Sequence, residues 1–203
     1  MAEKNPVPVP LLLGAERPAE RSDAARNRRK ILDATAHIVA HQGIDALSIH
    51  EVAQLANLGV GTVYRRFGDR AGLIFALLDE REQEFQHSFL AGPPPLGPGA
   101  EPKERIRAFL HALADRVYSQ RDLLLQAEIS SPMARFRSGP YTVYHSHLVA
   151  LIDHALPDAD GVCLADSLLA PLAARVLTFQ IDERGLTLHR IKAGLDALLD
   201  QDW

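Results

Sequence analysis

Twelve residues rich in proline and glycine constrain this chain more than any other feature of its sequence. Residues 91–102, AGPPPLGPGAEP, hold five prolines and three glycines. Proline lacks the backbone donor that a helix interior needs, so this stretch excludes helix and forms a stiff, extended connection. On either side, apolar residues recur at spacings of three and four, and no credible pair of strands is present. We therefore expect an all-α fold that this connection divides in two.

The part before the connection has the pattern of four helices, the first over residues 24–42. Ser48 followed by Glu51 is a capping-box signature for a short second helix. That helix ends at Asn57, a residue type that tolerates the left-handed conformation of a tight turn. The apolar face of a third helix follows at Val60–Phe67, and a fourth helix then continues to about residue 90. Two short helices joined by such a turn follow the helix-turn-helix plan.

Helical periodicity resumes beyond the connection and continues almost to the end of the chain. The expected helices span residues 103–119, 121–130, 141–155, 165–184 and 188–200. These patterns divide the chain into a disordered arm (1–23), a helix-turn-helix domain (24–70), a connecting helix (71–90), the proline-rich loop (91–102) and a larger helical domain (103–203).

Charge is distributed unevenly along the chain, although its net value is only -4. Residues 24–70 carry seven basic and four acidic side chains, which gives +3. Residues 71–203 carry twelve basic and eighteen acidic side chains, which gives −6. A polyanion would therefore bind the N-terminal third, and the remainder has no electrostatic reason to contact phosphate.

The sequence has no feature of a membrane-bound or disulfide-rich protein. No apolar run approaches the roughly 20 residues that span a bilayer. The single cysteine, Cys163, is compatible with a reducing cytoplasm, and we expect it to be a small core residue. We expect a soluble, cytoplasmic protein with no membrane partner.

Motifs for catalysis or metal binding are not found in the sequence. It has no glycine-rich phosphate loop, nucleophile elbow or carboxylate pair at motif spacing. His145 and His147 are two positions apart, about 200° around a helix, so they do not converge on a metal. His37 and His41 share a helix face but have no evident third ligand. We expect neither an enzyme nor a cofactor or metal site.

The outer side of the predicted third helix carries the residue types that contact DNA. Its inward face consists of Val60, Val63 and Phe67. The residues left outside are Gly61, Thr62, Arg65 and Arg66. A major groove accepts one α-helix, arginine pairs with guanine in a bidentate way, and threonine meets a thymine methyl or a phosphate. Gly61 would allow the backbone to approach DNA closely, and the Tyr64 hydroxyl would reach a phosphate. By periodicity alone, an ordinary helical bundle remains the alternative.

This segment resembles the DNA-binding signature of a known family. The signature of the TetR family of transcriptional regulators is similar to LSIHEVAQLANLGVGTVYRRFGDRAGLIFALL, and the first helix of that family resembles RRKILDATAHIVAHQGIDA. The resemblance spans about residues 26–79. It implies a recognition helix at Val60–Phe67 with Thr62, Tyr64 and Arg65 as leading DNA contacts. Arg70 occupies the position where the family commonly has a phosphate-binding lysine.

Two positions depart from the family pattern. Asn57 stands where the family usually has glycine, which is a benign exchange because both accept the left-handed region. The family often begins its recognition helix with serine and a polar residue, whereas this chain has Gly59 and Val60. We therefore expect no side-chain cap on that helix, and the operator sequence cannot be transferred from relatives.

Two further groups would contact phosphate. The helix starts at Ser48 and Asp69 present backbone donors, although the charge of Asp69 weakens the second site. Arg28 belongs to a basic cluster with Arg26, Arg29 and Lys30 that would send an arm into the minor groove. The alternative for the cluster is a solvated helix start.

Dimerisation is expected because helix-turn-helix proteins bind paired half-sites. Leucine-rich stripes on the last two predicted helices suit a four-helix interface built from two subunits, and similarity to the family points to the same pair. The expected interface residues are Leu172, Val176, Phe179, Leu188, Ile191, Leu195 and Leu198. The alternative is that both stripes are buried within one subunit.

An effector pocket is expected among the middle helices, where polar residues interrupt apolar faces. The candidates are Gln126, Tyr141, Tyr144, His145 and Gln180. For each of them, a satisfied core or surface group is the alternative.

Together these features predict a sequence-specific regulator of transcription. It would bind a pseudo-palindromic double-stranded operator as a homodimer and act as a repressor that a small-molecule effector releases. One alternative is a helix-turn-helix regulator without a small-molecule effector, controlled by its abundance or by a protein partner. Another is a helical carrier or enzyme that retained a vestigial helix-turn-helix.

Overall fold

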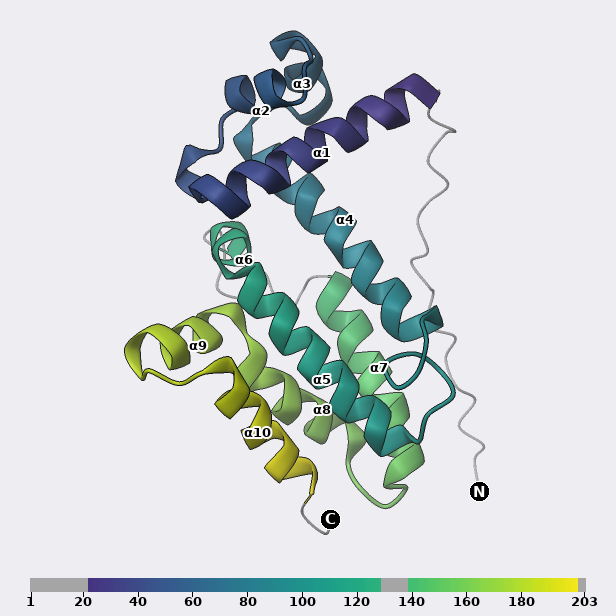
Figure 1. The fold of residues 1–203 in the computed structure, drawn as a ribbon. Helices are drawn as coiled ribbons and strands as arrows, with labels where there is room; N and C mark the ends of the chain where they lie inside the picture. Colours follow the sequence, from purple (N-terminus) through teal and green to yellow (C-terminus); the bar gives the residue numbers. More distant parts are fainter. Residues whose placement is uncertain (1–21, 129–138, 201–203) are drawn as a thin grey trace.

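The fold consists of helices and connecting loops, with no strand, over residues 22–128 and 139–200, the parts that this computed structural model describes (Figure 1). The first four helices are α1 (Ser22–Gln42), α2 (Ile49–Leu55), α3 (Val60–Phe67) and α4 (Arg70–Ala91), with a short 3₁₀ turn at Ile44–Ala46. The helices beyond the proline-rich loop are α5 (Pro102–Ser119), α6 (Arg121–Glu128), α7 (Gly139–Ala155), α8 (Gly161–Leu169), α9 (Ala174–Thr178) and α10 (Leu188–Leu199). The expected all-α class is confirmed, whereas the arm expected over 1–23 lies almost wholly outside the described residues.

The N-terminal helices enclose one hydrophobic core. Ile31 and Ile38 of α1 and Val63 of α3 are buried there, together with Leu73 and Leu77 from the first half of α4. Leu123 of α6 belongs to the same core and is only 1% exposed, although α6 comes after the proline-rich loop. Figure 1 shows α6 directly below α1. The C-terminal part therefore contributes a side chain to the core of the N-terminal part.

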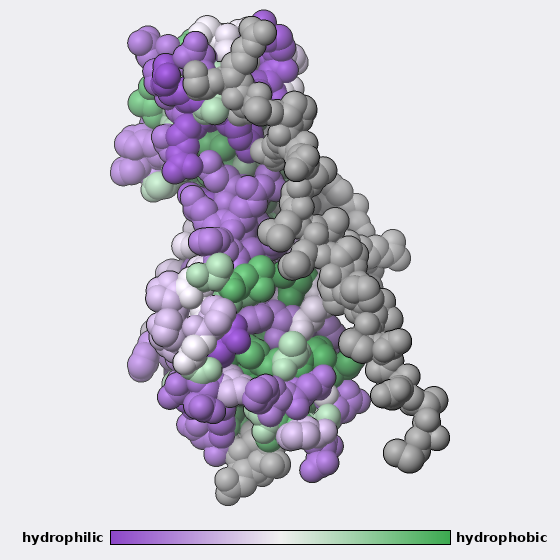
Figure 2. Space-filling model, turned by 90° about the vertical axis from the view of Figure 1, so that its right-hand side faces the viewer, coloured by the Kyte–Doolittle hydropathy of each residue, from purple (hydrophilic) through white to green (hydrophobic). Residues whose placement is uncertain are grey.

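A second core lies between α4, α5, α7, α8, α9 and α10. From the second half of α4, Phe85 packs edge-on against Tyr144 of α7 and Phe89 packs edge-on against Phe109 of α5. In Figure 2, the visible surface of the N-terminal helices is mainly hydrophilic, whereas apolar side chains gather on the same face of the C-terminal part. No single helix among the described residues is long and apolar enough to cross a membrane; the pair Gly161–Leu172 and Ala174–Glu183 passes that test only together, with a 48° bend.

The single helix expected over residues 165–184 is wrong, because the chain breaks there. α8 starts earlier, at Gly161, where the carboxylate of Asp160 accepts a hydrogen bond from the Cys163 amide at 3.0 Å. Pro171 then stands in a 3₁₀ turn, since it has no amide hydrogen to continue the α-helical bonding. α9 follows and passes into a π-helical segment at Phe179–Glu183. Cys163 is exposed on α8, so its expected place in the core is also wrong.

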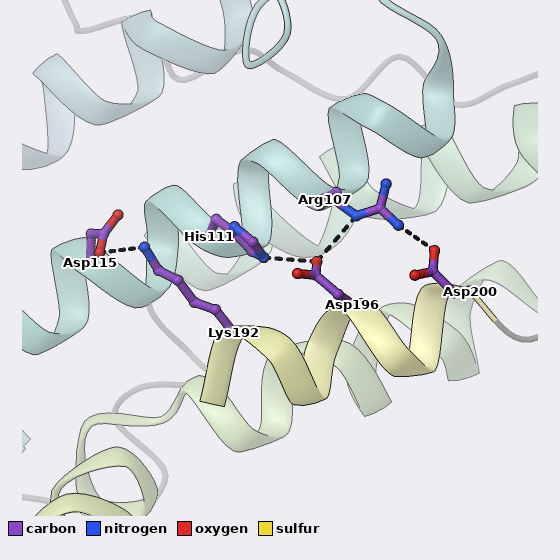
Figure 3. A network of polar contacts seen from close by, with 6 residues as sticks. All are labelled: Arg107, His111, Asp115, Lys192, Asp196 and Asp200. Atoms are coloured by element: carbon purple, nitrogen blue, oxygen red, sulfur yellow. Dashed lines mark hydrogen bonds and ion pairs between the residues drawn. The ribbon is translucent and has the colours of Figure 1, made fainter. Parts of the chain in front are cut away.

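A polar seam fixes α10 against α5 (Figure 3). Asp196 accepts hydrogen bonds from the Arg107 Nε at 3.1 Å and from the His111 Nε2 at 2.8 Å. Arg107 also pairs with Asp200, and the Lys192 ammonium lies 2.5 Å from Asp115. The buried side of α10 lies beneath this seam, and its members are Ile191, Leu195 and Leu199. The seam and the buried side together hold α10 on its own subunit.

A buried ion pair joins α4 to α5 and α7. The Arg116 Nη2 lies 2.7 Å from the Glu82 Oε2, and the two side chains are only 9% and 10% exposed. Arg116 also donates to the Tyr144 hydroxyl at 3.0 Å, and that hydroxyl donates to Glu82. The Gln86 amide satisfies the other Glu82 oxygen at 2.7 Å. Each charge is therefore compensated by groups that only the folded chain brings together.

Replacing the arginine of this pair should destabilise the fold strongly. In Arg116→Met the packing volume is roughly kept, but the buried Glu82 carboxylate loses its counter-ion, so we expect the free energy of unfolding to fall by about 3–5 kcal/mol. Urea denaturation followed by circular dichroism measures the change. Arg190→Met on the exposed side of α10 is the control and should change stability by less than about 0.5 kcal/mol. An equal loss of stability in the two variants would contradict the assignment of Arg116 as the counter-ion of buried Glu82.

Candidate nucleic-acid interface

Helix α2 begins where its capping pattern predicts. The Ser48 side chain accepts a hydrogen bond from the Glu51 amide at 3.2 Å and donates to the Glu51 carboxylate at 3.2 Å. Val52 and Ala53 then bury one face of the helix against α1 and α3. The Ser48 hydroxyl thus positions α2 as well as being a candidate phosphate contact.

The turn between α2 and α3 depends on one left-handed residue. Asn57 has φ 54, and the Leu58 amide donates to the Ala53 carbonyl at 2.9 Å. Gly59 has an extended conformation, with φ −67, so the turn does not use the conformational freedom of this glycine. No side chain caps α3 at Gly59, which confirms the expectation drawn from Gly59 and Val60.

The outer face of α3 presents a compact set of polar groups. Val63 is fully buried and fixes the helix, while Tyr64 is 61% exposed and Arg65 is exposed beside it. Thr62 is half-buried and Gly61 is open to solvent. The expectation that Val60 turns inward is wrong, because this first residue of the helix is 36% exposed. Thr62, Tyr64 and Arg65 remain predictions as leading DNA contacts, on a face that no other described helix covers.

Two of the expected contact residues instead have partners within the domain. Arg66 donates to the Ala24 carbonyl at 3.0 Å and is half-buried. Arg70 donates to the Ile44 carbonyl at 2.6 Å and lies 3.9 Å from the Asp45 carboxylate. Both guanidinium groups hold helices together, because the last turn of α3 and the first turn of α4 face α1 and the 3₁₀ turn. The DNA contact of Arg66 and the phosphate role of Arg70 remain predictions.

The basic cluster at the start of α1 is partly neutralised. Arg26 pairs with Asp23 at 3.0 Å, and Arg29 pairs with Glu80 at 3.3 Å. The guanidinium of Arg28 lies 5.9 Å from the centre of the Phe67 ring, next to the end of α3. Within the described residues neither Arg28 nor Lys30 has a carboxylate partner, and we keep Arg28 as the candidate phosphate contact because it lies next to α3.

The expected effector residues do not converge on one site. The Tyr141 hydroxyl donates to the Asp166 carboxylate at 2.7 Å, and His145 lies 3.5 Å from the same carboxylate. Tyr144 is part of the buried ion-pair cluster, and Gln126 is exposed on α6. The Gln180 amide oxygen is buried without a hydrogen-bond partner in the described residues.

Sequence patterns missed the buried ion pair of Glu82 and Arg116, because an acid and a base 34 positions apart give no local signal.

The expected dimer residues are divided between the core and the surface. Leu172, Ile191 and Leu195 are buried within their own subunit, and Leu188 packs partly against the same core. Burial within one subunit, the alternative, therefore holds for Leu172, Ile191 and Leu195, and the dimer role of Leu188 remains a prediction. The exposed members are Val176, Phe179 and Leu198, and α8 adds Val162, which the sequence patterns missed.

The arrangement of α1, α2 and α3 defines a helix-turn-helix domain, and comparisons with known proteins place it in a family. Residues 31–77 match the model of bacterial regulatory proteins of the tetR family. The chain is 36% identical over 105 residues to the HTH-type transcriptional repressor KstR of Rhodococcus jostii (strain RHA1), which covers 51% of this chain and 46% of the repressor. It thus spans about half the length of this curated relative. The helix-turn-helix domain is therefore similar to that of tetR-family regulators over residues 31–77.

Solved structures share most of the fold at low sequence identity. A regulator of the TetR/AcrR family from Thermobifida fusca has a TM-score of 0.66 at 19% identity, covering 87% of this chain and 97% of that one. AibR, solved in complex with isovaleryl coenzyme A and operator DNA, has a TM-score of 0.58 at 21% identity, covering 85% and 97%. These likenesses extend through the C-terminal part and confirm the fold beyond the helix-turn-helix.

Two glycines provide a matched test of the α3–α4 geometry. A Cβ atom on Gly72 would lie 1.8 Å from the Phe67 carbonyl oxygen, whereas one on Gly61 would meet no atom within 4 Å. We expect Gly72→Ala to lower the free energy of unfolding by about 1–3 kcal/mol through overpacking. Gly61→Ala should raise it by up to about 1 kcal/mol, because alanine favours helix. Denaturant titrations of both variants measure the difference, and equal shifts would show that the junction is not tight.

Proposed function

We propose that this protein is a homodimeric regulator of transcription that binds operator DNA through α3 and acts as a repressor. The observation that carries the proposal is the outer face of α3, where Thr62, Tyr64 and Arg65 project from a helix that Val63 anchors on its other side. An exposed helix of this kind fits a major groove, and arginine is the side chain that most often reads guanine. Under this proposal the protein regulates transcription rather than catalysing a reaction, and it acts in the cytoplasm, where its operator lies.

Phosphate contacts would fix the position of α3 in the groove. We expect these contacts from Arg28 beside Phe67, from the Tyr64 hydroxyl and from the start of α2 at Ser48. The uncapped amides at the start of α3 add donors for the same phosphates. Contacts of this type supply affinity without base preference.

A second copy of the chain would cover the exposed apolar side chains of α8, α9 and α10. Val162, Val176 and Phe179 face solvent although each is apolar. A symmetric dimer would bury them and present two α3 helices to half-sites about 34 Å apart or a multiple of that distance. The polar seam between α5 and α10 supports this role, because it holds one wall of the interface in place.

A small-molecule effector would release the repressor by moving α4. AibR was solved with isovaleryl coenzyme A and operator DNA, so this fold can accommodate both kinds of ligand. In the present chain, α4 contacts the C-terminal part through Glu82 and contacts α6 through the core that contains Leu123. A ligand that shifts α5, α6 or α7 would therefore tilt α4 and change the separation of the two α3 helices. Control by abundance or by a protein partner remains the alternative.

The first experiment is a gel shift with DNA that flanks the gene of this protein. We expect binding that weakens as salt increases, because phosphate contacts release counter-ions. Arg65→Ala should relax the preference at one base pair by about 1–3 kcal/mol. Lys103→Ala at the start of α5 is the control and should leave binding unchanged. If Arg65→Ala lowered the affinity equally for all DNA sequences, Arg65 would contact phosphate rather than a base. If no DNA fragment shifted at low salt, the DNA-binding proposal would be wrong.

Two exposed phenylalanines test the dimer surface. Phe179 in the π-helical segment is 53% exposed, and Phe75 on α4 is 57% exposed. We expect Phe179→Glu to produce monomers in sedimentation velocity, because it places a charge where the second copy would pack. Phe75→Glu should leave the dimer intact. Dissociation by Phe75→Glu and not by Phe179→Glu would place the interface on α4 instead.

A further inference from the structure

A cleft of about 400 Å³ lies between the start of α5 and the second half of α7. The loop and α5 contribute Glu101 and Arg105, and α7 contributes His147, Ala150, Leu151 and His154. These four positions on α7 share one face of the helix, because they are three, four and seven positions apart. None of the effector residues expected from the sequence lines this cleft.

Arg105 is a half-buried cation without an acidic partner. Arg107 and Arg116 on the same helix pair with carboxylates, but Arg105 pairs with none among the described residues. Its Nη2 donates to the Phe89 carbonyl at 3.3 Å, and its Nε is buried without an acceptor. Burial of a charge is costly unless a counter-ion compensates it. The cleft thus contains a positive group whose electrostatic partner is not supplied by the described chain.

His147 places a second polar group beside Arg105. Its Nε2 is buried with no hydrogen-bond partner in the described residues, and its ring lies 4.6 Å from the Phe89 ring and 5.1 Å from the Phe109 ring. Burial and the nearby charge of Arg105 lower the pKa of His147 to about 4. The imidazole is therefore neutral at neutral pH and can donate one N–H bond without adding charge.

We infer that this cleft binds the carboxylate of a small amphipathic organic acid, with Arg105 as its counter-ion and His147 as a neutral donor. A carboxylate supplies the negative charge and the acceptors that these two side chains lack. Ala150 and Leu151 offer an apolar wall for the hydrocarbon part of the same molecule. Glu101 lines the cleft four positions before Arg105 and lowers the affinity through repulsion.

The test uses the full-length protein and three probes in isothermal titration calorimetry at pH 7.5 and low salt. We expect sodium octanoate to bind with measurable heat, 1-octanol to bind at least about tenfold more weakly, and inorganic phosphate not to bind. Octanol that binds as tightly as octanoate would overturn the inference, because the cleft would then recognise only the hydrocarbon. Phosphate that binds as tightly would also overturn it, because the hydrocarbon part would then be irrelevant.

Two substitutions should change octanoate affinity in opposite directions. Arg105→Gln should weaken binding about tenfold through loss of the counter-ion. Glu101→Gln should strengthen it severalfold, and because Glu101 is exposed, this variant tests the cleft even where Arg105→Gln disturbs folding. Arg190→Gln on α10 is the control and should leave the affinity unchanged. Unchanged affinity in both cleft variants would overturn the inference, whether or not the protein shifts DNA in a gel.

Discussion

One helix belongs to both hydrophobic cores of this protein, and the rest of the structure depends on that arrangement. α4 runs for 22 residues, and its first half buries Leu73 and Leu77 among the N-terminal helices. Its second half buries Phe85 and Phe89 among α5 and α7. Because one continuous helix contributes to both cores, the orientation of α3 is fixed relative to the C-terminal part through packing rather than through the proline-rich loop.

The buried Glu82 lies on α4 between these two apolar segments. Its pairing with Arg116 fixes the rotation of α4 about its axis, since the carboxylate is satisfied only when it faces α5 and the Tyr144 hydroxyl. Apolar packing alone would tolerate a small rotation of the helix. The ion pair thus adds directional specificity to a contact that is otherwise only apolar.

Local sequence signals were sufficient for the helix-turn-helix, but not for contacts over long distances in the chain. The serine cap of α2 and the left-handed Asn57 could be predicted because each depends on neighbouring residues. The partners of Arg66 and Arg70 could not, because a long side chain reaches whatever the tertiary fold brings near it. Periodicity identified the buried stripe of α10 but could not tell burial within a subunit from burial between subunits. The helix break at Pro171 could have been predicted from the sequence, because proline interrupts a helix even where the apolar pattern continues around it.

Leu123 has a consequence for how this architecture can change during evolution. The C-terminal half supplies this side chain, yet it completes the core of the N-terminal half. A hybrid that joined these N-terminal helices to the second half of another protein would inherit a cavity unless that half presented a side chain of similar size at the same place. The two halves must therefore coevolve at this contact, and they are not freely interchangeable modules.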